Sequence, residues 1–503
     1  MSTELLKAAA DSNQWAAIFP ELILACAALG LLALEIVLPK SQHRLIPTAA
    51  VFALLAVLVG LVINFDTAWL GETTFAGLLR HNMPGQIARV FFTISSLLVC
   101  SIASVVLPRS KMPRVEFYTL VLVITAAMML LVQSNHFVMF FVALETITIG
   151  FYILVSYFRD NALTLEAGLK YLVTGALSSA IMLFGIVLLY GAVGRVDAGG
   201  VAHTGFEFDV VADFLAKNPT NFLAIVGSLL VLSGVGFKIG AFPFQIWIPD
   251  VYQGAPTPVT AFLAVGSKAA GFAVLLTLVH NVFAPLEAIL VPVLSTLAAA
   301  TLLFGNLSAL SQRNTKRLMG LSGVSHAGFL LLGVTASITV PWASGAVWFY
   351  LFTYMFASMA VFGVMAHLAG EDDTQQDLDG YDRLAKDRPF LAAVLAIGVG
   401  SLAGIPPLAG FMGKLLVFMA AFEAGLYTLL AIAIVCVVVS IYYYFGWIKA
   451  AWFETWRPEG EASAPVPATE PSFINTALLA SLALVTVLLG FFQQPLSVWL
   501  LNR

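Results

Sequence analysis

Six ionisable side chains lie inside long apolar runs of this sequence, where a charge is costly. The run FVMFFVALETITIGFYILV holds one carboxyl group near its middle, and five other runs each hold a lysine or a histidine. A charge at the centre of a bilayer costs at least about 2.5–3.5 kcal/mol, so charges retained there mark ion or proton paths by default. The candidates for proton transfer are Glu145, Lys170, Lys238, Lys268, His326 and Lys414.

Glu145 and Lys238 have the chemistry of a proton switch. No basic residue lies within one helical turn of Glu145, so any partner must come from another helix. An ammonium group beside a carboxylate keeps its proton, whereas a separated, poorly hydrated ammonium releases it more readily. Two plainer interpretations stay open. Glu145 can be a protonated, hydrogen-bonded core carboxyl, or the two residues can form a static ion pair that fixes helix packing.

The other four candidates also allow two interpretations each. Lys268 lies in LAVGSKAAGF, where small residues admit water or a close helix. Lys414 belongs either to a second path or to a side chain that reaches back to the membrane interface. His326 can titrate near neutral pH, yet a lone histidine on an apolar helix is often a satisfied core residue. Lys170 follows Glu166 at the i,i+4 spacing, which fits a proton relay or a local surface pair.

Prolines interrupt two of the lysine-bearing runs. Pro243 lies five residues after Lys238; it lacks an N–H and clashes with the carbonyl four residues earlier, so the helix must break or kink there. Pro406 and Pro407 play the same part in GIPPLAGFMGK. Inside hydrocarbon the freed carbonyls need water or a polar side chain. Each break therefore predicts a hydrated pocket beside a lysine at mid-membrane.

The elements that position these residues are those of an all-α polytopic membrane protein. Of the 503 residues, 60% are hydrophobic and 10% are charged, whereas soluble proteins carry about 25% charged residues. Apolar runs of ~20 residues, each long enough to span a bilayer, recur along the chain. The fourteen expected transmembrane segments are 17–38, 46–64, 86–107, 116–133, 136–157, 163–190, 221–247, 257–282, 285–309, 316–336, 342–369, 389–418, 424–448 and 472–496.

Composition also excludes some classes of partner. The net charge of -4 gives no sign of a nucleic-acid partner. Three cysteines without CxxC spacing argue against a metal site or disulfides. The polar start MSTELLKAAADSNQW has no signal-peptide pattern, so we expect no cleaved leader.

Lysine and arginine residues predict the orientation. Fourteen of the 24 fall in connections after odd-numbered segments, Lys316 among them, and six fall on the other side, Arg89 among them. Cytoplasmic loops carry the excess of positive charge. We therefore expect the odd-numbered connections to face the cytoplasm and both termini to face the outer, periplasmic side.

A faint internal repeat is visible. YLVTGALSSAIMLFG from Tyr171 and YLFTYMFASMAVFG from Tyr350 share residues at an offset of 179, and Lys238 and Lys414 are 176 apart. We interpret the fourth to eighth and the ninth to thirteenth segments as two five-helix units, inverted because five is odd, with the seventh and twelfth helices broken. The expected division is 1–115 (three helices), 116–283 and 284–450 (the repeats), 451–471 (a flexible linker) and 472–503 (a last helix).

Three long stretches carry a family resemblance. FKIGAFPFQIWIPDVYQGAPTPVTAFLAVGSKAAGF, QRNTKRLMGLSGVSHAGFLLLG and SLAGIPPLAGFMGK resemble the antiporter-like membrane subunits of respiratory complex I. YQGAPTPV and EAGLKYLVTGALSSAIMLFGIVLLYG point to the subunit N branch of that family in bacteria. The resemblance covers essentially the whole chain, including the expected number of helices.

The resemblance implies a role in coupling quinone reduction, performed elsewhere in the complex, to proton pumping across the bacterial inner membrane. The family's glutamate and lysines of the proton path match Glu145, Lys238, Lys268 and Lys414, and a further family lysine matches Lys170. Relatives often carry histidine seven residues after the seventh-helix lysine, where this chain has Gln245. Glutamine orients water but does not titrate.

The resemblance also implies partners and cofactors. NADH, FMN, iron–sulfur clusters and quinone would be bound by partner subunits, and this chain would hold none of them. The expected neighbours are a second antiporter-like subunit, small membrane subunits and lipids. Two alternatives stay open: an Mrp-type or free-standing sodium/proton antiporter subunit, which shares the broken helices and lysines, and a purely structural scaffold.

Overall fold

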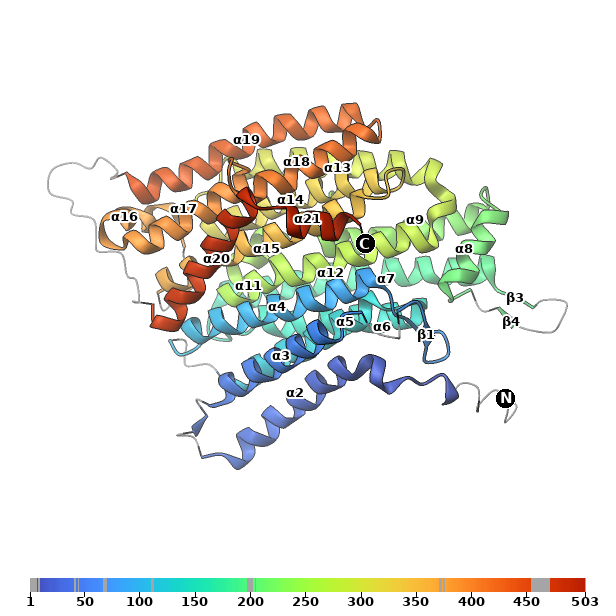
Figure 1. The fold of residues 1–503 in the computed structure, drawn as a ribbon, viewed down its shortest axis with the longest axis horizontal. Helices are drawn as coiled ribbons and strands as arrows, with labels where there is room; N and C mark the ends of the chain where they lie inside the picture. The colour runs from blue at the N-terminus through green and yellow to red at the C-terminus, as the bar shows by residue number, and fades with distance from the viewer. Residues whose placement is uncertain are drawn as a thin grey trace.

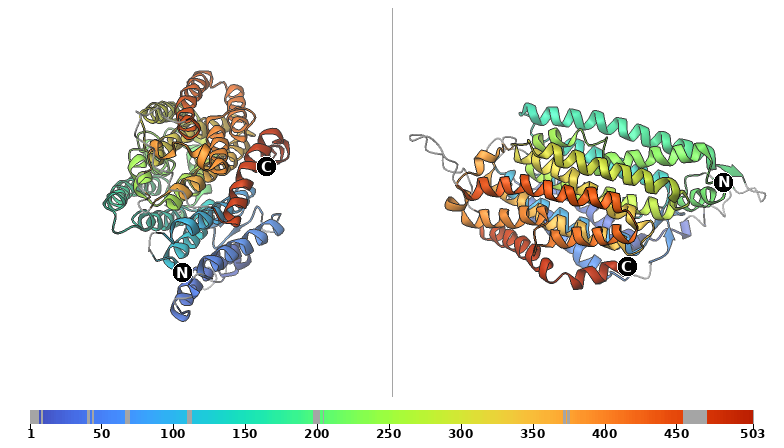
Figure 2. Two further views of the ribbon diagram at one scale, coloured as in Figure 1. Left: turned by 90° about the vertical axis from the view of Figure 1, so that its left-hand side faces the viewer. Right: turned by 90° about the horizontal axis from the view of Figure 1, so that it is seen from above.

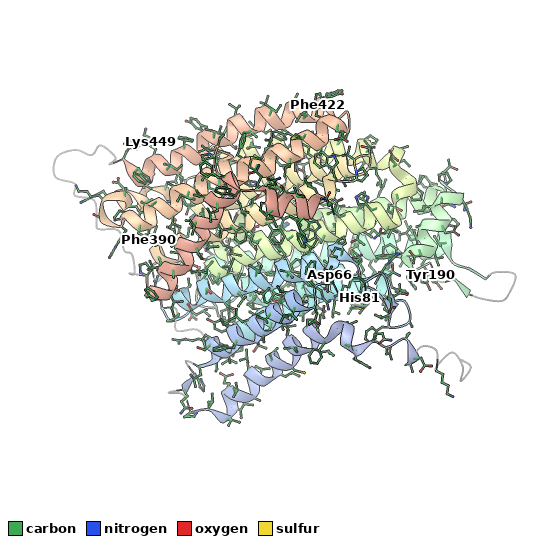
Figure 3. The ribbon with its side chains drawn as sticks, viewed as in Figure 1. Asp66, His81, Tyr190, Phe390, Phe422 and Lys449 are labelled. Atoms are coloured by element: carbon green, nitrogen blue, oxygen red, sulfur yellow. The ribbon has the colours of Figure 1, made fainter. Side chains whose placement is uncertain are left out.

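Long apolar helices run side by side along the longest axis of the computed structural model (Figure 1). The structure describes residues 7, 10–39, 42, 43, 45–66, 70–109, 113–196, 202, 203, 205–370, 373, 376–453 and 471–502. Helices α2 (Phe19–Val37) and α3 (Leu45–Ile63) lie at one edge of the bundle, and α19 (Tyr427–Trp452) lies at the opposite edge (Figures 1 and 2). Figure 3 places Lys449 and Phe390 near one end of the bundle and Tyr190 near the other.

The expected all-α membrane fold is confirmed. In the part of the chain that is described, 13 helical runs are long and apolar enough to cross a membrane. Besides α2, α3 and α19, the long helices are α4 (Met83–Val106), α5 (Val115–Val132), α6 (Phe137–Val155), α7 (Ala162–Val193), α9 (Phe222–Ile239), α13 (Glu287–Ala309), α14 (Thr315–Ser337), α15 (Ala343–Leu368) and α20 (Phe473–Phe491). The thirteenth run, 257–282, comprises α11 (Thr257–Phe262), the π-helix η3 (Leu263–Ser267), α12 (Lys268–Thr277) and the π-helix η4 (Leu278–Val282).

Asparagine side chains begin several of these helices. Asn82 Oδ1 accepts the backbone N–H of Gly85 at the start of α4, and Asn161, Asn221 and Asn314 cap α7, α9 and α14 in the same way. A capping oxygen satisfies one of the first four backbone N–H groups, which have no partner within the helix. The sequence therefore marks where these helices begin.

The structure corrects the bounds of both expected broken segments. The segment 221–247 is helical only to Ile239, where Gly240 ends α9 with a left-handed φ of 76°. The chain then turns before α10 (Ile248–Gly254). The segment 389–418 is two helices, α17 (Pro389–Ala403) and α18 (Ala409–Glu423), and Gly404 ends α17 with a φ of 85°. Glycine adopts this conformation without strain, so the prolines follow the helix ends rather than cause a kink within them.

The loops hold elements that the sequence analysis did not predict. Helix α8 (Phe208–Lys217) and the antiparallel pair β3 (Arg195–Val196) and β4 (Ala202–His203) lie between α7 and α9. A second pair, β1 (Thr73–Thr74) and β2 (Leu79–Arg80), precedes α4. The described part of the chain also contains the short helices η1 (Trp15–Ile18), η5 (Ala284–Leu286), η6 (Leu378–Tyr381), α16 (Leu384–Asp387) and α21 (Gln494–Leu501). Most of the expected linker, 454–470, lies outside the described residues.

The helices that carry Lys268 and His326 lie at the centre of the bundle. The most apolar stretch of α14 is completely buried, and those of α15 and of the run 257–282 are almost so. In α2, α3, α7 and α20 at most a third of the residues of this stretch are buried, as expected of helices that face lipid. The proposed division into an N-terminal segment and two inverted repeats stays a prediction.

Close helix contacts depend on glycine at two facing positions. A Cβ added to Gly185 on α7 would lie 2.7 Å from the carbonyl oxygen of Gly227 on α9, and one added to Gly227 would lie 2.9 Å from that of Gly185. Small residues let helix backbones approach closely, which replaces the missing hydrophobic drive between helices in lipid. This contact holds α9, and with it Lys238, against α7.

We expect Gly185→Ala to lower stability, because the new methyl group meets backbone atoms that cannot rotate away. Overpacking of this kind costs about 1–3 kcal/mol. Gly191→Ala on the same helix is the matched control, since a Cβ there meets nothing within 4 Å. Thermal aggregation of the detergent-extracted protein should shift to lower temperature for Gly185→Ala alone. Equal behaviour of the two variants would contradict the close packing of α7 and α9.

Candidate functional site

Lys238 lies in the last turn of α9, just before the first break. Its ammonium group is buried and donates to Thr148 Oγ1 on α6 at 3.2 Å. The same Nζ lies 5.6 Å from the centroid of the Phe151 ring, one turn further along α6. A hydroxyl and an aromatic face are therefore the groups that receive this buried cation.

Glu145 lies one turn before Thr148 on the same helix. Its Oε1 accepts from Ser179 Oγ of α7 at 2.5 Å, and the carboxyl group is only partly buried. No carboxylate of the described residues lies within 4.0 Å of Lys238 Nζ. The structure therefore contains no static ion pair between Glu145 and Lys238. The Lys238 ammonium group contacts Thr148, and Glu145 lies one turn away from Thr148 on α6.

The first break leaves a polar group for water. Phe242 N–H donates to Thr301 Oγ1 of α13 at 3.0 Å, which satisfies one freed backbone group. Gln245 is buried, and its Oε1 has no hydrogen-bond partner among the described residues. A buried amide oxygen without a protein partner is where ordered water is expected.

Lys268 is the first residue of α12, directly after the π-helix η3. Its Nζ donates to the carbonyl oxygen of Gly323 on α14 at 2.5 Å and lies 5.8 Å from the Tyr354 ring. Gly323 leaves this space free, because a Cβ there would come within 2.9 Å of Lys268 Nζ. Gly271, one turn after Lys268, lies against the side chain of Lys238: a Cβ added to Gly271 would lie 3.5 Å from Lys238 Cγ. Helix α12, which begins with Lys268, thus packs against the last turn of α9, which carries Lys238.

Helix α14 continues the row from Lys268 to Lys414. Gly323, His326 and Phe329 follow one another at steps of three residues, so each lies beside the next on the helix surface. Gly323 receives Lys268, and the Phe329 ring lies 5.0 Å from Lys414 Nζ. His326 lies between them.

His326 is fully engaged in hydrogen bonds. Its Nδ1 lies 2.7 Å from the Tyr350 hydroxyl and its Nε2 lies 3.1 Å from the Tyr444 hydroxyl. Both ring nitrogens have partners, as in a satisfied core histidine, and each partner is a hydroxyl that can itself pass a proton. The geometry is compatible with both interpretations of His326.

Lys414 lies in the core and does not reach back to the interface. Its Nζ donates to the carbonyl oxygens of Leu402 and Ala403 at 3.0 and 2.9 Å. These are carbonyls of the last turn of α17, where the helix dipole favours a cation. The ammonium group thereby satisfies backbone groups that the second break leaves without partners.

Lys170 lies outside this row. It forms ion pairs of 2.7 Å with Glu166 and with Asp250, and its side chain is 43% exposed. Asp250 also accepts from Arg317 at 2.6 Å, so one carboxylate joins α7, α10 and α14. Burial alone would raise the pKa of Asp250, but the hydrogen bonds from Lys170 and Arg317 together lower it below its ordinary value of 3.8. The surface-pair interpretation of Lys170 fits this geometry.

Two buried ion pairs correct the expectation that Arg89 and Lys316 are loop charges. Arg89 lies in α4 and pairs with Glu21 of α2, both nearly inaccessible. Lys316 is fully buried at the start of α14, where it bonds Ala255 O at 2.5 Å and lies 3.7 Å from Asp373. The signal was present: Arg89 falls inside the expected segment 86–107, and a charge inside such a segment needs a partner.

A helical membrane bundle with two broken helices and a buried row of lysines defines the class of antiporter-like membrane subunits. The family described as NADH:quinone oxidoreductase/Mrp antiporter, TM, matches residues 134–440. The chain is 60% identical over its full length to NADH-quinone oxidoreductase subunit N 1 of Opitutus terrae, which it also covers completely. It is 36% identical to subunit N of Desulfitobacterium hafniense, with 95% of each chain covered. The chain belongs to the NADH-quinone oxidoreductase subunit N family.

Solved structures agree with this assignment. A chain of respiratory complex I from Thermus thermophilus with bound aureothin superposes with a TM-score of 0.76 at 31% identity, covering 95% of this chain and 98% of that one. A chain of the Mrp complex from a Dietzia species reaches 0.78 at 21% identity, covering 96% and 97%. The second likeness shows a shared fold alone.

Asp250 gives a pH-dependent prediction. The pKa of Asp250 is lowered in the folded state, so its ion pairs with Lys170 and Arg317 stabilise the fold at pH values above the ordinary carboxyl pKa of 3.8. This contribution is lost as pH falls through the folded-state pKa. We expect Asp250→Asn to melt at lower temperature than the parent at pH 7 and pH 5, with the gap closing only below pH 3.8. Asp209→Asn, which removes an exposed pair with Arg80, should change little at any pH. A gap that closes already near pH 5 would contradict the assignment.

Proposed function

We propose that this chain is a proton-translocating membrane subunit of NADH-quinone oxidoreductase. In this role it couples quinone reduction elsewhere in the complex to proton transfer through Glu145, Lys238, Lys268 and Lys414. The observation that carries the proposal is the buried row of three lysines across α9, α12, α14 and α18. A chain of the subunit N family has little other reason to retain three such cations, since each is costly in an apolar core.

Proton transfer along this row needs hydroxyls and water between the lysines. Thr148 touches the Lys238 ammonium directly, and Glu145 lies one turn beyond it. If the Glu145 side chain moved along α6 by about one helical turn, its carboxylate would reach the Lys238 ammonium group and would keep the proton on that lysine. The present separation of the two groups favours release of the proton towards Lys268. Ordered water at Gln245 would hydrate the first break. His326, with its two tyrosines, would connect Lys268 to Lys414.

The redox chemistry would reside in partners. We infer that NADH, FMN, the iron–sulfur clusters and quinone are bound by other subunits, and that this chain contributes no redox centre. A second antiporter-like subunit and small membrane subunits would complete the membrane part. The chain would lie in the bacterial inner membrane with both termini on the periplasmic side.

The likeness to the Mrp complex does not favour the antiporter alternative. It lies at 21% identity and reflects the fold, whereas full-length identity of 60% joins the chain to a subunit N. Co-purification with NADH:quinone oxidoreductase activity would separate the two roles, because a free-standing antiporter would purify without it.

Lys238→Met and Glu145→Gln should each reduce proton pumping in membrane vesicles driven by NADH. A positioned proton-transfer group contributes about 10²–10⁴-fold to a rate, so we expect at least about a tenfold loss. Quenching of a pH-sensitive acridine dye measures pumping, and NADH:ferricyanide activity reports whether the complex is assembled. Lys217→Met, which removes an exposed lysine paired with Asp213, is the control.

Normal pumping in assembled complexes of both variants would refute the proton path. Loss of assembly without an effect on the pumping of the remaining complex would instead favour the scaffold alternative.

Gly323→Ala tests the row without removing a charge. The added methyl group would enter the space of Lys268 Nζ and displace it from the Gly323 carbonyl. We expect pumping to fall several-fold while ferricyanide activity stays normal. In Gly320→Ala, one turn earlier on α14, the atoms nearest to the added methyl group belong to the side chains of Ile248 and Tyr252 and not to Lys268, so this variant should pump normally. Unchanged pumping in Gly323→Ala would place Lys268 outside the path.

A further inference from the structure

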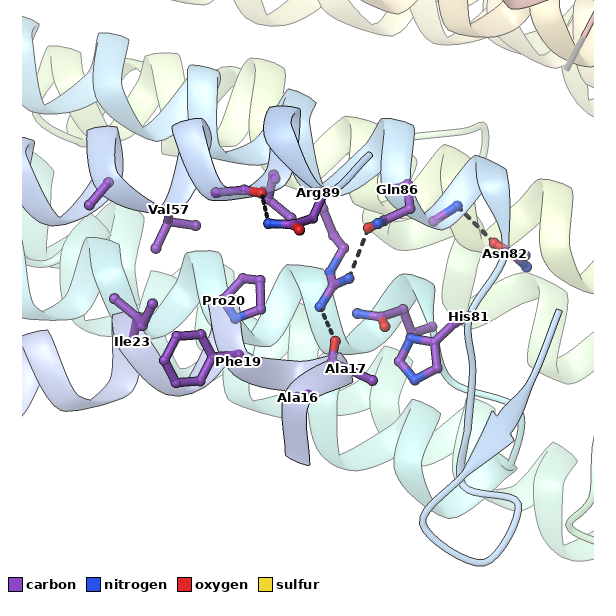
Figure 4. A pocket seen from close by; sticks show the side chains of 16 residues that line it. Ala16, Ala17, Phe19, Pro20, Ile23, Val57, His81, Asn82, Gln86 and Arg89 are labelled. Carbon is purple, nitrogen blue, oxygen red and sulfur yellow. Dashed lines mark hydrogen bonds between the residues drawn. The ribbon is translucent and has the colours of Figure 1, made fainter. Parts of the chain in front are cut away.

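A cavity of about 510 Å³ lies outside the lysine row, between the N-terminal ends of α2 and α4 and the C-terminal end of α3 (Figure 4). Its volume is within the range of about 300–1,000 Å³ that small-molecule sites occupy. Two of the three helices that form it, α2 and α3, lie at one edge of the bundle, and at most a third of the residues of their most apolar stretches are buried, so the cavity lies at the outer side of the bundle and apart from the lysine row.

One wall of the cavity is apolar. Phe19, Pro20 and Ile23 of α2 face Val57, Gly60 and Leu61 of α3 across it. Figure 4 shows the rings of Phe19 and Pro20 side by side along this wall. A surface of this composition between two lipid-facing helices suits a hydrocarbon chain.

The other end of the cavity is polar and buried. Arg89, of which 4% is exposed, donates to Glu21, to Gln86 and to the carbonyl of Ala17, in four hydrogen bonds. A guanidinium group has five N–H donors, so one N–H on Nη1 has no partner among the described residues. The amide of Asn82 lines the same end. This end therefore offers hydrogen-bond donors to an acceptor.

The polar end has no net charge. Arg89 is balanced by Glu21 at short range. Burial, and secondly the nearby guanidinium of Arg89, lowers the pKa of His81, so that this ring is neutral at pH 7. Arg89 lies six residues into α4, about 9 Å below its first residue at 1.5 Å per residue.

We propose that this cavity binds one phospholipid with a zwitterionic headgroup. Its phosphate oxygens would accept from Arg89 Nη1 and the Asn82 amide, and one acyl chain would lie along the wall of α2 and α3. The lipid carries hydrogen-bond acceptors next to a hydrocarbon chain, and the cavity carries hydrogen-bond donors next to an apolar wall. An anionic headgroup is disfavoured because the positive charge of Arg89 is already neutralised.

The test uses the intact complex, purified in mild detergent, with bound phospholipid counted by mass spectrometry of extracted lipid. Gly60→Leu fills the apolar part of the cavity. Gly30→Leu on α2 is the matched control: at both positions an added Cβ has no atom within 4 Å, but only Gly60 lines the cavity. Asn82→Asp keeps the cap of α4 but replaces the amide donor by a negative charge. Dioleoyl phosphatidylethanolamine, dioleoyl phosphatidylglycerol and ubiquinone are then added separately to delipidated complex.

We expect the parent and Gly30→Leu to hold one phosphatidylethanolamine more than Gly60→Leu, and Asn82→Asp to bind it about tenfold more weakly. Three results would overturn the proposal: an equal lipid count in Gly60→Leu, tighter binding of phosphatidylglycerol than of phosphatidylethanolamine, or displacement of the lipid by ubiquinone. Loss of a protein partner from Gly60→Leu at an unchanged lipid count would also overturn it, because the cavity would then be a protein contact.

Discussion

The arrangement depends on one constraint: a backbone that leaves the helical path inside an apolar medium must find partners for its freed groups. At the second break the ammonium of Lys414 binds the carbonyls of Leu402 and Ala403. At the first break Thr301 accepts the N–H of Phe242. A lysine at a helix end is therefore both a stabilising group and a titratable one. The same contact that permits the break fixes where a proton can be held.

Two helices, α6 and α14, organise the space between the breaks. On α6, Thr148 and Phe151, three residues apart, both contact Lys238. On α14, Gly323 binds Lys268 and Phe329 contacts Lys414, and His326 lies between these two positions. In each case a small polar group takes the ammonium and an aromatic face lies beside a lysine. The inverted-repeat interpretation stays a prediction.

The sequence predicted much of this, for physical reasons that also explain the failures. Hydrophobic length sets the membrane helices, so these were predictable, whereas the helix ends at Gly240 and Gly404 were not predicted, because the breaks were expected at the prolines. Charge alone was not enough to place a residue. Arg89 and Lys316 looked like loop charges, because only the fold brings Glu21 and Asp373 to them. Lys414 could not be assigned a depth before the helix end at Gly404 was known. The contact of Lys268 with a backbone carbonyl has no sequence signal at all.

The row on α14 also constrains how this chain can change over evolutionary time. Substitutions on other faces of the helix can be absorbed by repacking, but a residue gained or lost between Gly323 and Phe329 cannot. Each residue turns an α-helix by about 100°, so a single insertion would rotate Phe329 away from Lys414 while Gly323 stayed against Lys268. Length within this stretch should therefore vary less among relatives than residue identity does.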